Sequence, residues 1–241
     1  QFNLPAIQGT YIYLDALKGS ILGILEAKSL TVKRTAAASA LASQYLSRAN
    51  SSSLLMIGTG ALAPNLILAH ASVRPLKTVY VWGRDYARAM DICEKLQNAP
   101  FHIQPIKDIE DKISEVDIIS SATLSKTPLV LGKYLKPGQH VDLVGAYKVD
   151  MREADDETIN KAEVYIDTYQ GGLKESGDIV IPLKSGVLKE ADIKADLFEL
   201  TSQKKHGRRN DREITMFKSV GHALEDLAAA TYYYNMYQNK P

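Results

Sequence analysis

The chain has 241 residues, of which 45% are hydrophobic and 24% charged, a balance typical of a folded globular protein with one or two domains. Its 29 Lys and Arg residues nearly match its 28 Asp and Glu residues, so the net charge of +1 offers no strong field for nucleic acid or an anionic membrane. One cysteine, five scattered histidines and no apolar run near ~20 residues argue against a disulfide, a metal site and a membrane span, and we expect a cytoplasmic protein.

The N-terminal part of the chain predicts a β-hairpin followed by a long helix. Two β-rich runs within residues 9–27 flank the turn formers Lys18 and Gly19. Residues 30–49 are rich in alanine and predict a helix that begins near Thr31, as its N-cap, and ends near Ala49.

The central part alternates between strand and helix patterns, and this alternation predicts an α/β fold with a parallel sheet covered on both faces. The expected strands span 54–57, 78–82, 101–106, 116–123, 140–145 and 163–167, with helices at 61–71 and 85–97. Residues 171–213 are polar and rich in turn formers and predict no particular element. Residues 214–238 carry a long helical pattern that closes the chain.

The first of these strands ends in a glycine-rich turn, within the stretch LLMIGTGALA at residues 54–63. Two glycines let the backbone turn sharply and approach a ligand closely, and the helix that follows presents unpaired N–H groups and its positive dipole end to a phosphate. The strand-turn-helix context favours a dinucleotide site over a turn without a ligand. Its predicted residues are Gly58, Thr59, Gly60, Ala61 and Leu62.

The second strand ends in the stretch WGRD, which bears on the choice of dinucleotide. Arg84 can pair with a 2′-phosphate, which favours NADP(H), unless it is only a solvated loop cation. Asp85 can instead bind a free ribose hydroxyl, which leaves NAD(H) as the alternative, or cap the next helix.

Arg34 is the candidate for holding a substrate. In the predicted first turn of the 31–49 helix, the dipole favours an anion and the guanidinium offers two parallel hydrogen bonds to a carboxylate. An α-imino or α-amino acid fits such a site. The alternative is that Lys33 and Arg34 form an exposed cationic pair.

Six stretches in order carry a family resemblance: LTVKRTAAASALA, IGTGALA, VWGRD, HVDLVGAYKVDMREADDE, ESGD and EITMFKSVGHALEDLAAA. Between about Pro5 and Tyr234, the sequence resembles the ornithine cyclodeaminase/mu-crystallin family of NAD(P)-dependent proteins. The resemblance implies a Rossmann-type domain at 50–221. It also implies a smaller α+β substrate and dimerisation domain, formed in part by 1–49 with 222–241, and a homodimer.

The same resemblance implies roles for individual residues. Arg34 would hold the substrate carboxylate, and Thr35 would lie close to the cofactor. The residues implied to border the nicotinamide or its ribose are Ser121, Ala122, Thr123, Val144, Lys218, Ser219 and Gly221. Family members also carry several tens of residues ahead of this segment, so we expect the sequence to be incomplete at its N-terminus and the proton donor to lie there.

Members of the family include cyclodeaminases, ketimine reductases, amino-acid dehydrogenases and non-catalytic binders. Ring closure of ornithine needs a carboxylate base, and the resemblance implies that this base comes two residues after the glycine of the strand-end motif. Here that glycine is Gly145 and the position holds Tyr147, whose hydroxyl is a poor base at neutral pH. We therefore expect NAD(P)H-dependent reduction of Δ1-pyrroline-2-carboxylate or Δ1-piperideine-2-carboxylate to proline or pipecolate. The alternatives are an NAD-dependent ornithine cyclodeaminase, and a mu-crystallin-like protein that binds NADPH and a small ligand without turnover.

Overall fold

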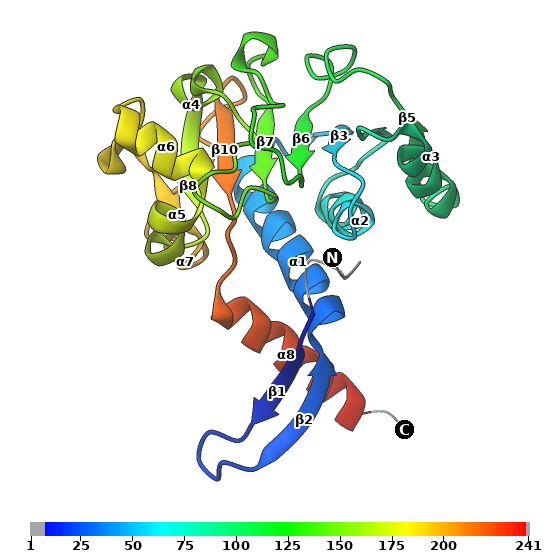
Figure 1. Ribbon diagram of the computed structural model, residues 1–241, viewed down its shortest axis with the longest axis vertical. Coiled ribbons are helices and arrows are strands. Elements are labelled where there is room, and N and C mark those ends of the chain that lie inside the picture. Colours follow the sequence, from blue (N-terminus) through cyan, green and yellow to red (C-terminus); the bar gives the residue numbers. More distant parts are fainter. Residues whose placement is uncertain (1–7, 240–241) are drawn as a thin grey trace.

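The computed structural model describes residues 8–239, so the beginning of the resembling stretch at Pro5 lies outside the described residues. Figure 1 shows an upper lobe, in which helices pack around a sheet, and a lower lobe made of a hairpin and the last helix. A long helix, α1 (Ala27–Leu46), runs from the sheet to the lower lobe and belongs to both. The predicted domain boundary at residue 49 follows the end of this helix.

The upper lobe contains an eight-stranded sheet in the order β5-β4-β3-β6-β7-β10-β8-β9, in which every neighbouring pair is parallel. The sheet confirms the predicted α/β class. Most of its strands are short runs of apolar residues buried on both faces, as expected of a parallel sheet. The strands are β3 (Ser53–Ile57), β4 (Thr78–Trp82), β5 (His102–Pro105), β6 (Ile118–Ser121), β7 (His140–Leu143), β8 (Ala162–Ile166), β9 (Ala195–Asp196) and β10 (Ile214–Lys218).

Helices and short turns connect these strands. They are α2 (Ala63–Val73), α3 (Tyr86–Lys95), α4 (Asp156–Lys161), α5 (Tyr169–Glu175), α6 (Gly177–Ser185) and α7 (Leu197–Thr201), with 3₁₀ turns η1 (Gly132–Tyr134) and η2 (Glu190–Asp192). Among residues 8–239, no helix is long and apolar enough to span a bilayer, and no group of three or more His, Cys, Asp or Glu side chains is placed to hold a metal ion.

The register of the sheet brings the carboxyl ends of its central strands to one edge. Ile57 lies opposite Ser121, and Ser121 lies opposite Leu143. Leu143 lies in turn opposite Lys218, which ends β10. The chain order reverses between β3 and β6, and such a switch point is where parallel α/β sheets bind ligands.

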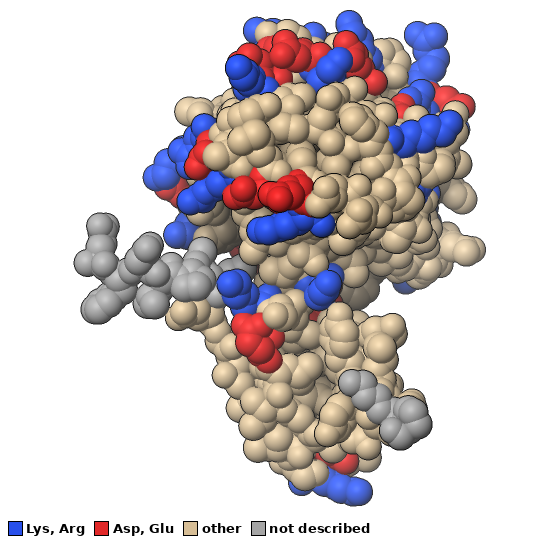
Figure 2. Space-filling view, turned by 90° about the vertical axis from the view of Figure 1, so that its right-hand side faces the viewer, with Lys and Arg blue, Asp and Glu red and all other residues tan. Residues whose placement is uncertain are grey.

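The lower lobe consists of the hairpin β1 (Thr10–Leu14) and β2 (Ile21–Glu26) and the helix α8 (Ala223–Gln238). The hairpin confirms its prediction. Tyr13 packs against Tyr234 with ring centroids 5.3 Å apart and accepts a hydrogen bond from Thr231. Figure 2 shows this lobe as mostly tan, with few charged side chains. Its exposed apolar residues include Ile12, Leu14, Leu17, Ile21, Ile24, Leu227, Tyr232, Met236 and Tyr237.

The predicted start of α1 was wrong by one turn. The helix begins at Ala27 because the Glu26 carboxylate accepts hydrogen bonds from the backbone N–H groups of Lys28 and Ser29, at 3.0 and 2.7 Å. Glutamate is an unusual N-cap, and the sequence pattern therefore favoured Thr31. Arg34 consequently lies in the third turn of the helix, so the helix dipole does not act on it as predicted.

Two further predictions are corrected in the C-terminal part. Residues 171–213, for which no element was predicted, contain most of α5 and all of α6, α7 and β9. The helical pattern predicted over 214–238 begins with a strand, because ITMFK is β10, a fully buried central strand between β7 and β8. A short apolar run fits a buried strand and a buried helix equally well, and only its sheet neighbours distinguish them.

A buried polar cluster lies where α1 and α2 cover the sheet. The Asp142 carboxylate accepts hydrogen bonds from Ser39 at 3.0 Å and Ser120 at 2.8 Å, and its other contact is His70 at 3.1 Å. These side chains are fully buried. His140, also fully buried, hydrogen-bonds with Thr215 through Nδ1. The cluster ties both helices to the centre of the sheet.

His140 should make the stability of the fold depend on pH. Burial lowers the pKa of His140 to about 3, whereas its reference value is 6.5. The folded chain therefore binds fewer protons than the unfolded chain between these values, and the stability that this group contributes above pH 6.5 is lost as the pH falls. From pH 6.5 to pH 5, the parent should lose about 1.5–2 kcal/mol more unfolding free energy than His140→Phe, as measured by urea unfolding.

The comparison between parent and variant isolates His140, because the other titrating groups are common to both. The exposed His102 provides a matched control: His102→Phe should retain the parental pH dependence. Equal losses in the parent and in His140→Phe would contradict the prediction.

Candidate active-site cleft

A cleft of about 540 Å³ lies at the edge where the central strands end, between the loops of the sheet and the N-terminal half of α1. Its wall combines the glycine turn after β3, the segments after β6, β7 and β10, and one face of α1. The lining residues are Lys28, Thr31, Val32, Arg34, Thr35, Gly60, Ala61, Leu62, Ala122, Thr123, Leu124, Val144, Gly145, Tyr147, Ser219 and Val220.

The glycine turn has the geometry expected of a dinucleotide site. Gly58 has a φ of 115°, and a Cβ there would collide with the carbonyl of Ala122. A Cβ at Gly60 would meet no atom within 4 Å, so the space above the turn is open. No side chain caps the N-terminus of α2. Ala63 N–H donates to the Gly60 carbonyl and Pro64 has no N–H, so the turn offers an anion mainly the positive end of the helix dipole and the open space at Gly60. These residues fit a dinucleotide phosphate.

Arg34 reaches this cleft from α1, and two carboxylates of α8 hold its guanidinium. Nη1 donates to Glu225 Oε2 at 2.9 Å, and Nε donates to Asp226 Oδ1 at 3.1 Å. The three side chains are only 14%, 17% and 24% exposed. Burial raises the pKa of Glu225 to about 7, against the opposing effect of the Arg34 charge. The structure therefore argues against the alternative in which Arg34 and Lys33 form an exposed cationic pair.

Asp167 shapes the loop between β10 and α8. Its Oδ2 accepts hydrogen bonds from the backbone N–H groups of Val220 and Gly221, both at 2.6 Å. Gly221 has a φ of 93°, and a Cβ there would collide with the guanidinium of Arg34. The loop can therefore pass beside Arg34 only because this position is a glycine.

A second group of buried charges fixes the segments after β6 and β7. Glu153 Oε1 accepts from Ser121 Oγ and from the backbone N–H and hydroxyl of Thr123, at 2.6–2.8 Å. Its Oε2 accepts from the Gly145 N–H at 2.7 Å, and burial raises the pKa of Glu153. Lys218 supplies the compensating charge.

The ammonium of Lys218 is fully buried, 3.1 Å from Asp178 and 4.0 Å from Glu153. The structure thus places Lys218 behind the cleft wall, not on it, although the sequence suggested that it borders the nicotinamide. Ser121 is also fully buried, with its hydroxyl on Glu153. Both side chains support the loops that line the cleft.

The cleft brings together most of the predicted site residues. Those on its wall are Arg34, Thr35, Gly60, Ala61, Leu62, Ala122, Thr123, Val144 and Ser219, while Gly58 and Gly221 stand directly behind it. Sequence reasoning missed Lys28, Thr31, Val32 and Leu124. Their positions follow from the true start of α1 and from the tertiary placement of loops, which no local pattern reports.

Three predicted residues do not line this cleft. Thr59 of the glycine turn packs against Gly83, where a Cβ would clash with its side chain. Arg84 and Asp85, which were predicted at the adenosine end, follow β4. Asp85 caps α3 by accepting from the Ala87 N–H at 3.1 Å, which agrees with the helix-cap alternative. Arg84 is exposed, and no hydrogen bond or ion pair of its side chain is found within residues 8–239.

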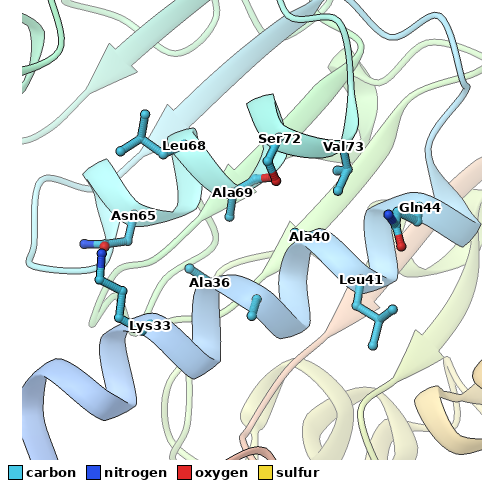
Figure 3. Close-up of a pocket in the computed structure, with 11 residues that line it drawn as sticks. Lys33, Ala36, Ala40, Leu41, Gln44, Asn65, Leu68, Ala69, Ser72 and Val73 are labelled. Atoms are coloured by element: carbon cyan, nitrogen blue, oxygen red, sulfur yellow. The ribbon is translucent and has the colours of Figure 1, made fainter. Parts of the chain in front are cut away.

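A second hollow of about 440 Å³ lies between α1 and α2 (Figure 3). Small and apolar side chains form most of its wall, with Lys33, Gln44, Asn65 and Ser72 as its polar members. It lacks the charged partners and strand ends of the cleft, so we assign the chemistry to the cleft.

The parallel sheet, the switch point and the glycine turn define a Rossmann-type dinucleotide-binding protein. Comparison with known proteins gives the family: the model of the ornithine cyclodeaminase/mu-crystallin family matches residues 1–241. The chain belongs to this family.

Three relatives illustrate the match. The Δ1-pyrroline-2-carboxylate reductase of Paracoccus denitrificans is 35% identical over 231 residues, which cover 95% of this chain and 73% of that protein. The solved structure of the Thermococcus litoralis Δ1-pyrroline-2-carboxylate reductase, in complex with NADH and L-proline, has a TM-score of 0.93 at 35% identity. The match covers 96% of this chain and 72% of the reductase chain. An archaeal alanine dehydrogenase dimer with bound NAD has a TM-score of 0.91 at 28% identity, and the match covers 99% of this chain and 74% of the dehydrogenase chain.

Substitution of Lys218 distinguishes a structural role from a cofactor-binding role. Lys218→Met should lower the unfolding free energy by about 3–5 kcal/mol, because Asp178 and Glu153 would remain buried without a counter-charge. Adding Asp178→Asn should restore part of this loss, since the amide oxygen can still accept from the N–H groups of Glu153 and Ala154. Urea unfolding measures both effects. A stable Lys218→Met protein with selectively weakened dinucleotide binding would instead favour the cofactor role.

Proposed function

We propose that this protein reduces a cyclic α-imino acid, Δ1-pyrroline-2-carboxylate or its six-membered homologue, to proline or pipecolate with a nicotinamide dinucleotide. The observation that carries the proposal is the position of Arg34, whose guanidinium shares one cleft with the glycine turn of the dinucleotide site. The similarity to reductases named for Δ1-pyrroline-2-carboxylate, one of them solved with NADH and L-proline, supports this substrate class.

Each part of the cleft wall has a task in this reaction. Arg34 binds the substrate carboxylate and thereby fixes the position of the adjacent C=N carbon. Leu62, Leu124 and Val220 give an apolar surface that suits a small saturated ring and excludes water. Reduction of the C=N bond also requires a proton on the imine nitrogen.

The residues of the glycine turn and the α2 N-terminus would hold the dinucleotide pyrophosphate, and Thr35, Ala122, Thr123, Val144 and Ser219 would border its nicotinamide end. The bound dinucleotide supplies the hydride that reduces the C=N bond. Glu153 keeps the loops after β6 and β7 in place for this contact, since its carboxylate accepts from the N–H groups of Thr123 and Gly145, and the Lys218 ammonium lies 4.0 Å from that carboxylate.

Tyr147 supports reduction over cyclodeamination. It lines the cleft and is 42% exposed, at the position where ring closure of ornithine would require a carboxylate base. A reductase needs no base there, because the imino acid already contains the ring.

We further propose that the protein is a homodimer joined through the lower lobe. Its hairpin and α8 expose large apolar side chains on neighbouring elements, which is typical of a surface that another chain covers. The similarity to an alanine dehydrogenase that forms a dimer supports the same conclusion.

The reaction itself is tested with two assays on one preparation. NADPH or NADH oxidation with Δ1-pyrroline-2-carboxylate should be readily measured, and ammonia release from L-ornithine with NAD⁺ should be negligible, because the carboxylate base that ring closure requires is absent. Tyr147→Asp should not create a cyclodeaminase, because a carboxylate that is not held in position loses much of its effect.

Arg34→Lys serves as the control for substrate binding. It should raise KM for the imino acid while leaving dinucleotide affinity near the parental value, since an ammonium cannot form the paired hydrogen bonds. Rapid ammonia release from ornithine would overturn the proposal in favour of a cyclodeaminase. Tight dinucleotide binding with no turnover in either assay would indicate a non-catalytic binder.

The cofactor preference rests on Arg84. Asp85 already serves as the cap of α3, so the exposed Arg84 is the better placed of the two to meet a 2′-phosphate. NADPH should therefore bind more tightly than NADH, and Arg84→Ala should remove about 1.5–3 kcal/mol of this preference, the value of a charge-assisted contact. Fluorescence titration with both dinucleotides measures it. Equal parental affinities, or an unchanged preference in the variant, would contradict the NADP(H) assignment.

A further inference from the structure

Arg34 is surrounded by more negative charge than it can neutralise. Glu225 and Asp226 bind its guanidinium directly, and Asp167 lies behind the loop that packs against it. The Asp167 charge is close enough to Glu225 to disfavour its ionised form. Arg34 therefore lies among three carboxyl groups before any substrate binds.

A substrate carboxylate at Arg34 would be a fourth negative group near this guanidinium, in a cleft whose other lining cation is Lys28. With all four ionised, the like charges in a partly buried site would repel one another and oppose binding. Protonation of one carboxyl group removes this conflict. A protonated carboxyl group still accepts a hydrogen bond through its carbonyl oxygen, so Arg34 would remain held in place.

Glu225 is the group in this cluster best suited to take the proton. It is 17% exposed against 24% for Asp226, and burial, Asp167 and Asp226 all raise its pKa, which stands at about 7 despite Arg34. Asp167 differs, because three backbone N–H groups donate hydrogen bonds to its carboxylate. The neighbouring titratable side chains are His222 and Tyr11. His222 caps α8 by accepting a hydrogen bond from the Leu224 N–H, and Tyr11 of β1 faces Asp226.

We infer that Glu225 takes up one proton from solvent when an anionic substrate binds Arg34, while Asp226 keeps the guanidinium oriented through its hydrogen bond with Nε. Both act through Arg34 and are positioning residues. The inference rests on the proposed function, because it takes Arg34 as the carboxylate-binding group. It adds that substrate affinity is linked to pH through a residue of α8, outside the lining of the cleft.

The test uses L-proline and NADH, because the charges of L-proline stay constant between about pH 6 and pH 8. Calorimetric titration of the NADH-loaded protein in two buffers of different ionisation heat gives both affinity and proton uptake. For the parent, affinity should weaken about tenfold from pH 6 to pH 8, and about one proton should be taken up at pH 8.

Glu225→Gln mimics the protonated side chain permanently. Its affinity should stay near the parental pH 6 value at both pH values, and the proton uptake at pH 8 should be lost. Asp226→Asn should retain proton uptake with its midpoint at lower pH, since a charge that raises the Glu225 pKa is removed. The exposed Glu94 on α3 gives a matched control, and Glu94→Gln should behave as the parent.

The outcomes separate this inference from the proposed function. Proline binding by the parent with flat pH dependence and no proton uptake would overturn the role of Glu225 and leave the carboxylate site at Arg34 intact. Proton uptake that persists in Glu225→Gln would assign the proton to another group and would equally overturn it. Failure of the NADH-loaded parent to bind L-proline at any pH would remove the proposed substrate class, and the inference with it.

Discussion

The hydrogen bonds that continue the parallel ladder past the strand ends are the constraint on which the rest of the cleft depends. Gly58 N–H donates to Trp82, Ala122 to Ile57, Val144 to Ser121 and Ser219 to Leu143, all within 2.8–3.0 Å. Each bond fixes the first loop residue after a strand relative to the last residue of the adjacent strand. Four loops from distant parts of the chain therefore form one wall at one edge of the sheet.

Buried charge supports this wall from behind. Glu153, Asp178 and Lys218 lie on different segments and are all buried, so the Lys218 ammonium is the counter-charge that both carboxyl groups share. Such groups contribute little net stability compared with apolar side chains, but they permit few alternative arrangements. We therefore interpret them as fixing the geometry of the loops, at a place where apolar residues could have supplied the burial.

The long helix α1 connects this wall to the lower lobe. Its C-terminal half packs on the sheet near Phe217, while its N-terminal half carries Arg34 into the cleft, where α8 binds it. Arg34 is consequently held between two lobes and not by one element. A shift of α8 relative to the sheet would move Glu225 and Asp226, and with them the guanidinium.

The amino-acid sequence by itself determined the hairpin, most strands of the sheet, the glycine turn and the family, because these depend on short-range patterns such as apolar runs, turn formers and motif order. Only the tertiary structure decided the rest. It showed that Glu26 and not Thr31 is the N-cap of α1, that ITMFK is a central strand, and that Lys218 supports the cleft from behind. It also placed Glu225 and Asp226 on Arg34, across about 190 residues of sequence. Contacts between segments so far apart in sequence arise from the packing of the two lobes, and no local propensity encodes them.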